Sequence, residues 1–373
     1  MIYHVLPESE PFSESRGGAI ARWTANVLSE GKEVIVCPSA DASYGFDDTR
    51  VLALRRLGYH KALRRPCRRL PWAMQKGVLF PLFREMIRSL SPGEMVWVHN
   101  RPEYAALLAE PLARRGVSVV LHMHNSHLLH SSMTELHDLR FVSVVFCSGY
   151  LRDEAEKRWP KRLPRTRVIY NGANARLFYR DLNKQNPVPR IVFTGRLVPE
   201  KGAHVLVDAM RLLEEWNIRA ECRIVGAGGF GSGTDGSYSK KLRTNAPRNV
   251  TFTGYLTGED LAREVRSADV FCCPSVWQEP FGMVNVEAMA CGVPVVASAV
   301  GGIPEALADG GGILVAHSDP RALADALRKL IVDHETRNAL GDAAFRISSR
   351  RFQWQSVRGE YTSAVEEMGG RLC

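Results

Sequence analysis

The stretch from Ser275 to Glu305 reads SVWQEPFGMVNVEAMACGVPVVASAVGGIPE and alternates strand and helix signals. A short apolar run predicts a strand over 270–275. A helix over about 283–291 follows, and Gly292 is a natural stop for it. The β-branched run 294–300 predicts a second strand, and Gly301-Gly302 marks the next turn. Similar alternation in both halves of the chain indicates parallel, doubly wound α/β sheets.

Two glutamates, Glu279 and Glu287, lie eight residues apart in this stretch, on either side of a Pro-Phe-Gly turn. The N-terminus of a helix offers backbone N–H groups to anions such as phosphate, and carboxylates accept hydrogen bonds from sugar hydroxyls. The pair therefore suits the binding of a nucleotide-sugar. Acidic residues near a helix start are also common as caps or dipole partners, and the spacing alone leaves both interpretations open.

This stretch resembles the E-x7-E element of the retaining glycosyltransferases of family 4. The likeness continues through residues 281–284, 287–289, 292–297 and 301–302. The family's diphosphate-binding loop resembles Thr194-Gly195-Arg196-Leu197 with Glu200-Lys201-Gly202. Its interdomain segment resembles Tyr170-Asn171-Gly172 with Phe178. Its N-terminal glycine loop resembles Arg16-Gly17-Gly18-Ala19.

The resemblance covers nearly the whole chain and implies the GT-B fold, in which two Rossmann-like, doubly wound domains face each other across a ligand-binding cleft. A length of 373 residues also favours two domains over a single hydrophobic core. We predict an N-terminal, acceptor-side domain over 1–182 and a C-terminal, nucleotide-sugar-binding domain over 183–353, which opens with the polar stretch 183–189. A terminal helix within 354–373 would complete the first domain.

The resemblance also implies a role for each candidate site residue. Glu279 would bind the donor sugar hydroxyls, and Glu287 would bind both ribose hydroxyls. The backbone N–H groups of Phe281, Gly282, Met283 and Val284 would bind sugar and phosphate. Gly17 and Gly18 would lie over the diphosphate, with a plain turn as the alternative. Tyr255 and Leu256, which follow the predicted strand 250–254, would flank the base.

Arg196 and Lys201 follow a predicted strand over 190–194, and each has a glycine beside it. Two cations there can neutralise a diphosphate leaving group, and losing one preorganised donor typically costs about 10²–10³ in rate. Exposed surface charges are the alternative. The family's reaction retains anomeric configuration: the acceptor oxygen enters on the leaving-group face, and the departing phosphate takes its proton. No protein nucleophile is then required.

His124 ends a predicted strand over 118–123 and, by resemblance, matches the histidine that faces the donor sugar, with Asn125 beside it. His122 would point to the opposite side of the strand and is interpreted as structural. With His127, these spacings allow a metal site, but no cysteine or carboxylate lies close to them in sequence. No Asp-x-Asp motif is present, and the acidic pair Asp47-Asp48 lies in a predicted loop. We therefore predict no metal, with the two cations taking its place.

The subfamily likeness is carried by His122-Met123-His124-Asn125 and the Gly-rich insert 226–241. Both resemble lipopolysaccharide-core and spore-coat glycosyltransferases, and the core enzymes that add N-acetylglucosamine are the nearest. This implies a UDP-sugar donor, UDP-N-acetylglucosamine or UDP-glucose, and a saccharide or lipid-linked acceptor in cell-surface polysaccharide or lipopolysaccharide synthesis. The donor is a substrate, and no cofactor is expected. A nucleotide-sugar epimerase on the same scaffold is the alternative, and it would need acid/base residues at the sugar.

The net charge of +9 is concentrated in one segment. Residues 50–88 contain eleven Lys or Arg and one acid, Glu85, so the rest of the chain is close to neutral. Mixed with Trp72, Phe80 and Phe83, these charges predict an amphipathic element that binds an anionic membrane surface, with a solvated basic helix as the alternative. Nucleic acid is not expected as a partner, because no nucleic-acid-binding motif appears.

The cellular compartment is predicted from the apolar runs, the N-terminal pattern and the cysteines of the sequence. No apolar run is long enough to span a bilayer, and the N-terminus has no charged-then-apolar signal pattern. The eight cysteines show no CxxC pair, and several, such as Cys272 and Cys273, fall in apolar strands where a thiol behaves as a small core residue. We expect a cytoplasmic protein that binds the inner face of the cytoplasmic membrane.

Overall fold

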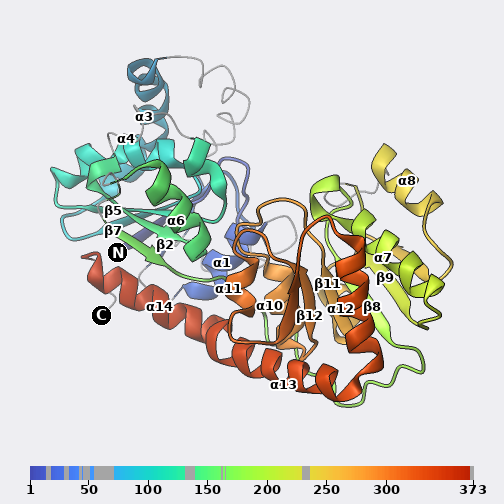
Figure 1. Cartoon of the computed structure of the whole chain (residues 1–373). Helices are drawn as coiled ribbons and strands as arrows, with labels where there is room; N and C mark the ends of the chain where they lie inside the picture. The colour runs from blue at the N-terminus through green and yellow to red at the C-terminus, as the bar shows by residue number, and fades with distance from the viewer. Residues whose placement is uncertain are drawn as a thin grey trace. The chain divides into compact units, whose positions relative to one another are not determined.

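The computed structural model describes residues 1–13, 18–28, 33–41, 44, 51–53, 71–130, 139–160, 163, 165–228 and 236–369. The chain divides into two compact units (Figure 1): unit 1 comprises Met1–Tyr170 and Gln355–Cys373, and unit 2 comprises Asn171–Trp354. The division precedes the predicted boundary at 182/183. Segment 171–182 belongs to unit 2 because the Ala173 N–H donates to the Phe352 carbonyl at 2.7 Å and Arg266 donates to the Leu177 carbonyl at 2.5 Å.

Unit 1 is built on a sheet of seven strands, and every neighbouring pair is parallel. The spatial order is β3-β2-β1-β4-β5-β6-β7. Most strands are short runs of buried β-branched residues, as expected where helices cover both faces of a parallel sheet. Their bounds are β1 Ile2–Val5, β2 Glu33–Cys37, β3 Val51–Ala53, β4 Met95–His99, β5 Ser118–Met123, β6 Val142–Phe146 and β7 Arg165–Val168.

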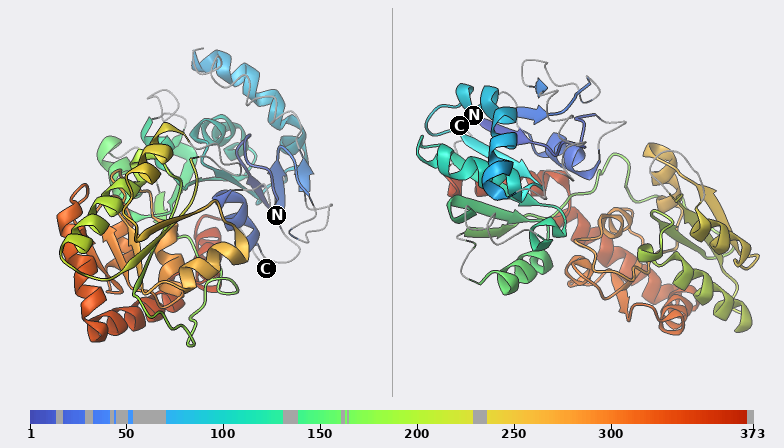
Figure 2. Two further views of the ribbon diagram at one scale, coloured as in Figure 1. Left: turned by 90° about the vertical axis from the view of Figure 1, so that its right-hand side faces the viewer. Right: turned by 90° about the horizontal axis from the view of Figure 1, so that it is seen from above.

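The helices described in unit 1 include the last helix of the chain. This helix, α14, is held by ion pairs from Arg167 to Glu360 and Glu367 and by a hydrogen bond from Arg358 to the Asn26 carbonyl. Figure 2 shows both ends of the chain in this unit. The helices are α1 Ala19–Val27, α3 Trp72–Ser89, α4 Pro102–Ala113, α6 Gly149–Arg158 and α14 Trp354–Glu367, with the 3-10 helices η3 Ser126–His130 and η4 Leu139–Phe141.

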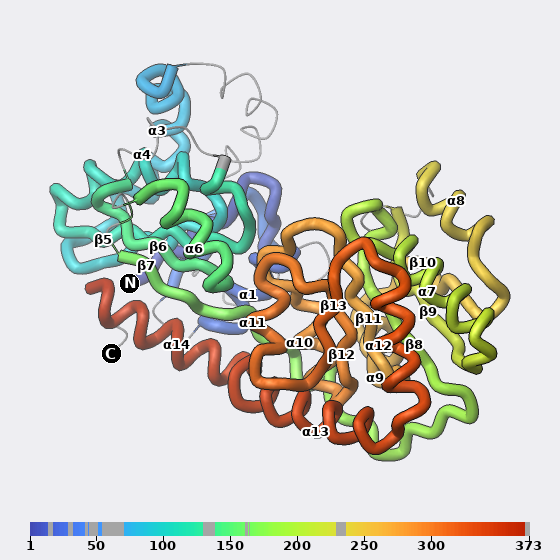
Figure 3. Tube along the Cα trace, viewed as in Figure 1, coloured from blue at the N-terminus to red at the C-terminus, as the bar shows by residue number. Residues whose placement is uncertain are grey.

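Unit 2 repeats the alternation on a parallel sheet of order β10-β9-β8-β11-β12-β13. Figure 3 follows the chain through it, from β8 in yellow-green to β13 in orange. The strands are β8 Arg190–Thr194, β9 Glu221–Val225, β10 Val250–Gly254, β11 Val270–Cys273, β12 Val295–Ser298 and β13 Gly312–Val315. The helices are η5 Pro199–Lys201, α7 Ala203–Glu215, α8 Ser237–Thr244, α9 Gly258–Arg266, α10 Met283–Ala290, α11 Ile303–Leu307, α12 Pro320–Val332 and α13 His334–Arg351.

The core of unit 2 lies on both faces of its sheet. On one face, α7 and α12 pack against alternate strand residues through Leu206, Met210 and Leu327. Residues in the intervening positions, such as Phe271 and Val295, are also fully buried and point to the side of α9 and α10, since side chains alternate along a strand.

In each sheet the strand order reverses once, between β1 and β4 in unit 1 and between β8 and β11 in unit 2. Loops that leave the carboxyl ends of two such strands diverge, and ligands of open α/β sheets bind in the crevice between them. Arg196 follows β8, and Ser275 to Glu279 follow β11, so the sequence-predicted residues lie at this reversal in unit 2.

Two helices of unit 2 begin differently. The side chain of Asp319 caps α12 by accepting from the Ala322 N–H at 2.9 Å. Thr257 is the N-cap residue of α9, but its side chain makes no cap hydrogen bond. None of the helices in the described ranges combines the length and the apolar character that a membrane crossing requires.

Candidate functional site

A compact polar cluster lies at the carboxyl end of β11 in unit 2. Lys201 forms an ion pair with Oε1 of Glu279, and the Ser275 hydroxyl donates to the same oxygen at 2.8 Å. The Lys201 ammonium also lies over the Trp277 ring, 5.4 Å from its centroid. Glu279 is buried, and its carboxylate is oriented by two donors on different loops. Lys201 and Glu279 were predicted to share one site, and the structure brings them into contact.

The close approach of these loops depends on Gly202. This residue ends η5 with a φ of +70°, in the left-handed region. A Cβ at this position would overlap the carbonyl oxygen of Pro274, so only glycine lets the loop after β8 reach the loop after β11. The Val276 N–H donates to the Glu200 carbonyl at 3.0 Å and ties the two loops together.

A second glycine supports the backbone of Glu279 itself. Gly301 has a φ of +57°, and a Cβ there would overlap the backbone of Glu279. The adjacent Gly302 N–H donates to the Glu279 carbonyl at 2.8 Å, and the Gly301 N–H donates to the Gln278 side chain at 2.7 Å. The Gly-Gly pair quoted from the sequence therefore fixes the backbone of the Glu279 loop by hydrogen bonds and close packing.

The N-terminus of α10 comes directly after this loop. Its N-cap residue, Gly282, has a φ of +81° and provides no side-chain cap, so the first N–H groups of α10 receive no bond from a capping side chain. Asn285, one turn into the helix, is fully buried, and its side chain lies within hydrogen-bond reach of the Cys273 thiol at the end of β11.

The other predicted residues of unit 2 surround this region to different degrees. Met283 and Val284 occupy the first turn of α10 and are half-buried, as is Glu287 further along the same helix. The Phe281 side chain is buried against Phe352, with ring centroids 5.8 Å apart, so only its backbone can serve a ligand. Arg196 is exposed after β8, and Tyr255 (exposed) and Leu256 (half-buried) follow β10, two strands further along the sheet edge.

The one thiol close to the cluster is not a nucleophile. Cys273 ends β11, and burial raises the pKa of its thiol to about 11. It therefore stays protonated at neutral pH, when only the thiolate is reactive. The six cysteines in the described ranges are buried and form no disulfide.

In unit 1 the glycine-loop prediction falls partly outside the described residues, which include Gly18 but not Gly17. Gly18 is the N-cap of α1, and its N–H donates to Oε1 of Glu10 at 2.8 Å. The Ala21 N–H donates to the same oxygen at 3.1 Å. A carboxylate therefore occupies the helix N-terminus at which a donor diphosphate was predicted.

His124 follows β5 and lies in a cluster of aromatic and imidazole rings. Its Nε2 is 3.1 Å from Nδ1 of His99, and its backbone N–H donates to the Asn100 side chain at 2.7 Å. His122 does not point away from it: their ring centroids are 3.9 Å apart, since residues two positions apart along a strand lie on the same face. The expectation that His122 points to the opposite side was therefore wrong.

The histidines that could hold a metal ion differ from the set His122, His124 and His127 that the sequence suggested. His99, His122 and His124 bring ring nitrogens within 4.8 Å of one another, whereas Nδ1 of His127 lies 3.4 Å from the Arg101 guanidinium and 3.3 Å from the Asn100 carbonyl. Burial lowers the pKa of His99 and of His122 well below 6.5, so both are neutral. His99 was missed because no short spacing connects it to residues 122–127.

The structure also shows polar and aromatic residues near the candidate positions that the sequence analysis did not single out. Ser275 and Trp277 flank Glu279, and Asn285 lies one turn into α10. Glu8, Arg101 and Tyr104 form a buried cluster after β1 and β4, in which Arg101 donates to both oxygens of Glu8 at 2.6 and 3.0 Å. Asn285 has a usable sequence signal, because it and Glu287 are the two polar residues of an otherwise apolar helix, α10.

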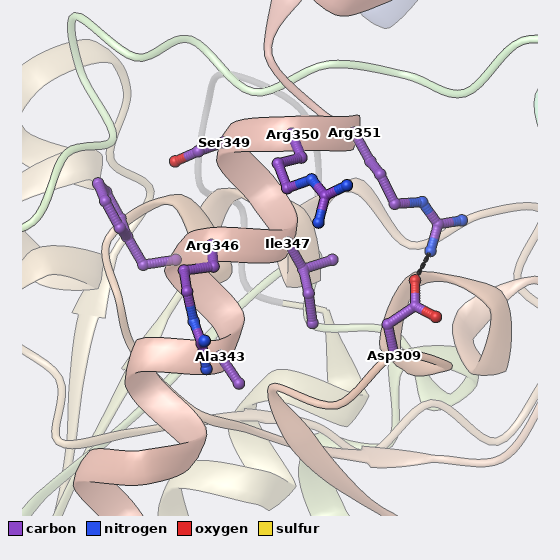
Figure 4. Close-up of a pocket in the computed structure, with 8 residues that line it drawn as sticks. Asp309, Ala343, Arg346, Ile347, Ser349, Arg350 and Arg351 are labelled. Atoms are coloured by element: carbon purple, nitrogen blue, oxygen red, sulfur yellow. Dashed lines mark hydrogen bonds and ion pairs between the residues drawn. The ribbon is translucent and has the colours of Figure 1, made fainter.

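Two surface cavities of unit 2 contain none of the predicted site residues. One, of about 820 Å³, lies along α13 beside Asp309, which is paired with Arg351 (Figure 4). The other, of about 420 Å³, lies between α7 and α8 and is lined by His204 and Tyr238 among others. The candidate site is therefore defined by its polar contacts and not by these cavities.

Comparison with known proteins identifies the family. Residues 176–346 match the family of glycosyl transferases group 1. Spore coat protein SA of Bacillus subtilis (strain 168) is 26% identical over 297 residues, which cover 74% of this chain and 78% of that protein. An uncharacterized glycosyltransferase of Methanocaldococcus jannaschii is 31% identical over 269 residues, which cover 67% of each protein.

Among solved structures, Anabaena HepE in complex with UDP superimposes with a TM-score of 0.74 over 98% of this chain and 99% of that chain, at 21% identity. At that identity the likeness establishes the fold alone, and it confirms the predicted GT-B type with two Rossmann-like, parallel-sheet domains. With the family match in unit 2 and the archaeal relative, the chain belongs to the glycosyl transferases group 1.

Proposed function

We propose that this glycosyltransferase is a retaining enzyme that takes a sugar from a UDP-sugar, UDP-N-acetylglucosamine or UDP-glucose. The observation that carries the proposal is the Lys201–Glu279–Ser275 cluster at the β8/β11 reversal, next to the uncapped N-terminus of α10. A cation, an oriented carboxylate and helix N–H groups together match a diphosphate joined to a sugar. The complexes of HepE with UDP and UDP-glucose support the choice of base.

Each group then has a chemical role. The Glu279 carboxylate accepts hydrogen bonds from donor sugar hydroxyls and holds the anomeric carbon in place. The N–H groups of residues 281–284 bind sugar and phosphate, and Glu287 accepts from both ribose hydroxyls. Lys201 and Arg196 neutralise the charge that develops on the leaving diphosphate. Tyr255 and Leu256 flank the base, Gly17 and Gly18 lie over the diphosphate, and His124 contacts the sugar.

Retention of configuration follows from a reaction on one face of the sugar. The acceptor oxygen forms a bond to the anomeric carbon on the side from which the diphosphate leaves, and a departing phosphate oxygen takes the acceptor's proton. This step needs no protein nucleophile, in keeping with the protonated state of Cys273. It also needs no metal if the two cations carry the electrostatic stabilisation, so we propose that transfer is metal-independent.

The acceptor is proposed to be a saccharide or a lipid-linked saccharide in the synthesis of lipopolysaccharide or another cell-surface polysaccharide. The likeness to a spore coat protein supports a role in surface layers. Helix α3 supports work at a membrane: Met74, Val78 and Phe80 are exposed on it, while its opposite side, including Leu79 and Phe83, is buried in unit 1. We propose that α3 and the basic segment before it bind the inner face of the cytoplasmic membrane. Family membership favours transfer over the alternative, nucleotide-sugar epimerisation.

The first experiment is a thermal-shift panel with UDP-, GDP- and ADP-sugars, followed by a transfer assay with the sugar that stabilises best. A ligand at a hundred times its dissociation constant adds about 2.7 kcal/mol to stability, which the panel resolves. Lys201→Ala and Arg196→Ala should each lower transfer by about 10² or more with the fold intact, and EDTA should leave the wild-type rate unchanged. Wild-type turnover in either variant, or a metal-rescued loss with EDTA, would contradict the proposed roles. Conversion of free nucleotide-sugar without transfer would indicate the epimerase.

A further inference from the structure

A continuous chain of buried hydrogen bonds connects the interior of unit 1 to His124. It begins at the carboxylate of Glu33 on β2, which accepts from the Tyr361 hydroxyl of α14 at 3.0 Å. The same hydroxyl lies 2.9 Å from Nε2 of His4 on β1. Nδ1 of His4 is 3.2 Å from Nε2 of His99 on β4, and Nδ1 of His99 is 3.1 Å from Nε2 of His124. Four elements, β2, α14, β1 and β4, and the residue that follows β5 thus meet in one line of contacts.

The direction of this chain follows from counting protons. The Tyr361 hydroxyl has a single proton, which it donates to Glu33, so its oxygen accepts from Nε2–H of His4. Burial lowers the pKa of His4 to about 3, so His4 is neutral, and with its one ring proton on Nε2 its Nδ1 is an acceptor. His99 is neutral for the same reason and donates from Nε2 to His4. Its Nδ1 then accepts from Nε2–H of His124.

We propose that this chain sets the tautomer of His124, with the proton on Nε2 and with Nδ1 unprotonated, and that Tyr361, His4 and His99 are positioning residues for sugar transfer. The inference rests on the proposed function insofar as His124 contacts the donor sugar. An unprotonated ring nitrogen accepts a hydrogen bond from a sugar hydroxyl, whereas a ring N–H has to find an acceptor. The bond from the His124 backbone to Asn100 keeps the residue itself in place.

The same rings also bear on the possible metal site. In the chain, His99 uses both ring nitrogens and His124 uses Nε2, each at an ordinary hydrogen-bond distance. An ion held by His99, His122 and His124 would have to replace the bond between His99 and His124. His122, whose ring nitrogens have no hydrogen-bond partner among the described residues, packs edge-on against Trp23 with centroids 4.5 Å apart. Metal content therefore discriminates between a metal centre and a hydrogen-bond chain.

The direct test is nuclear magnetic resonance of the full-length protein with ¹⁵N-labelled histidine, in the absence of any substrate. Long-range proton–nitrogen correlations distinguish protonated from unprotonated ring nitrogens. We expect His4, His99 and His124, assigned by single substitutions, to be neutral and protonated on Nε2, and the purified protein to contain no stoichiometric metal. Protonation of His99 or His124 on Nδ1, or one bound ion per chain at these histidines, would overturn the inference.

Tyr361→Phe removes the hydroxyl that sets the direction but keeps the ring. His4 then has no acceptor for Nε2–H, so the chain can reverse, and the proton of His124 should move to Nδ1 in part or all of the protein. Val365→Ala is the matched control, because Val365 is fully buried in the same helix and is not in the chain. It should destabilise α14 and leave every tautomer unchanged.

Transfer kinetics connect the tautomer to function. We expect Tyr361→Phe to lower kcat/KM for the UDP-sugar roughly tenfold, about the worth of one hydrogen bond, and to leave the affinity for UDP unchanged because UDP lacks the sugar. Val365→Ala should retain kcat/KM at a temperature where it is folded. A shifted tautomer with unchanged kcat/KM, or an unshifted tautomer in Tyr361→Phe, would refute the positioning role. If no sugar is transferred by the wild type, the proposed function fails while the tautomer measurement still decides the hydrogen-bond chain.

Discussion

The Glu10 carboxylate accepts a hydrogen bond from the backbone N–H of Gly18 at 2.8 Å, at the start of α1. It therefore takes the position that an anionic ligand would use, since helix N-termini attract carboxylate and phosphate alike. The Gly-Gly loop was predicted to lie over the donor diphosphate, and on that prediction the two anions would compete for the same N–H groups. If the donor diphosphate binds at this loop, Glu10 would have to give up these bonds when the donor enters.

This relationship predicts that Glu10→Ala binds the donor more tightly. Releasing the N–H groups of Gly18 and Ala21 should lower the dissociation constant of the UDP-sugar about fivefold, which corresponds to about 1 kcal/mol for a charge at a helix end. The unliganded variant should lose a similar amount of stability, because α1 loses its cap. Calorimetry measures the first effect and urea denaturation the second. Glu110→Gln, a change to an exposed carboxylate of α4, is the control, and equal or weaker donor binding by Glu10→Ala would contradict the competition.

The two glutamates of the quoted stretch should differ in kinetic effect. Glu287→Ala should weaken UDP binding, because the ribose is common to donor and product. Glu279→Ala should lower kcat by about 10² and change UDP affinity little, because Glu279 is assigned to the reacting sugar. Calorimetry with free UDP and initial rates with the UDP-sugar separate the two. Unchanged UDP affinity in Glu287→Ala would exclude the ribose role.

The main strands were predictable because their signals are local. The strands 118–123, 190–194 and 250–254 have the predicted bounds, since each is a short β-branched run between turn residues. Weaker local signals were missed: β3 has only three residues, and α13 is largely polar on its exposed side. The Lys201–Glu279 contact was predictable as a shared site because both residues follow neighbouring strands of a parallel sheet.

The histidine chain was not predictable, because its members come from five distant segments. Tyr361 and His4 are separated by 357 residues and meet only when α14 packs on β1. The Glu10 cap was missed for a similar reason: a carboxylate eight residues before Gly18 is outside the usual capping-box spacing. Tertiary packing, and not local pattern, decides both features.

Two glycines with left-handed backbones form a matched pair for testing the loop contact at the site. Gly258→Ala, at φ +53° with open space around it, should cost about 1 kcal/mol of unfolding free energy from backbone strain. Gly202→Ala, at φ +70°, adds an overlap with the Pro274 carbonyl and should cost roughly 3 kcal/mol or more. It should also lower transfer by displacing Lys201. Urea denaturation of both variants measures the difference, and equal losses would show that the loops do not need this close approach.

The buried histidines predict that stability falls in acid. Burial holds the pKa of His4 near 3 and those of His99 and His122 well below 6.5, so the native state keeps them neutral. The unfolded chain binds protons as the pH falls through 6.5, so their contribution is intact above that pH and is lost below it. Each such histidine contributes a slope of about 1.4 kcal/mol per pH unit below 6.5.

Urea denaturation at several pH values between 7.5 and 5 checks this sign and size. His122→Phe should reduce the slope by about 1.4 kcal/mol per pH unit, since it removes one buried site that does not belong to the hydrogen-bond chain. His317→Phe, a change to an exposed histidine of unit 2, should leave the slope unchanged. Identical slopes for His122→Phe and the wild type would mean that His122 is not held neutral in the fold.

Helix α3 predicts salt-sensitive binding to anionic membranes. Its exposed side carries Met74, Val78 and Phe80, which are 57%, 39% and 38% exposed, and the segment before it supplies most of the eleven cations of residues 50–88. Each Lys or Arg near an anionic bilayer is worth about 1 kcal/mol, and the apolar side chains add to this when buried. The protein should therefore sediment with phosphatidylglycerol vesicles and not with phosphatidylcholine vesicles, and less so as salt is added.

Two sets of substitutions separate the charged from the apolar contribution. Changing Arg64, Arg65, Arg68 and Arg69 to serine, residues outside the described ranges, should weaken binding and reduce its salt dependence. Changing Met74 and Val78 to serine should weaken binding at every salt concentration, because the apolar term is not screened. Leu182→Ser, at a residue of unit 2 that is 82% exposed, is the control for loss of an exposed apolar side chain. Wild-type protein that stays in the supernatant at low salt with anionic vesicles would refute the membrane role and leave a soluble acceptor.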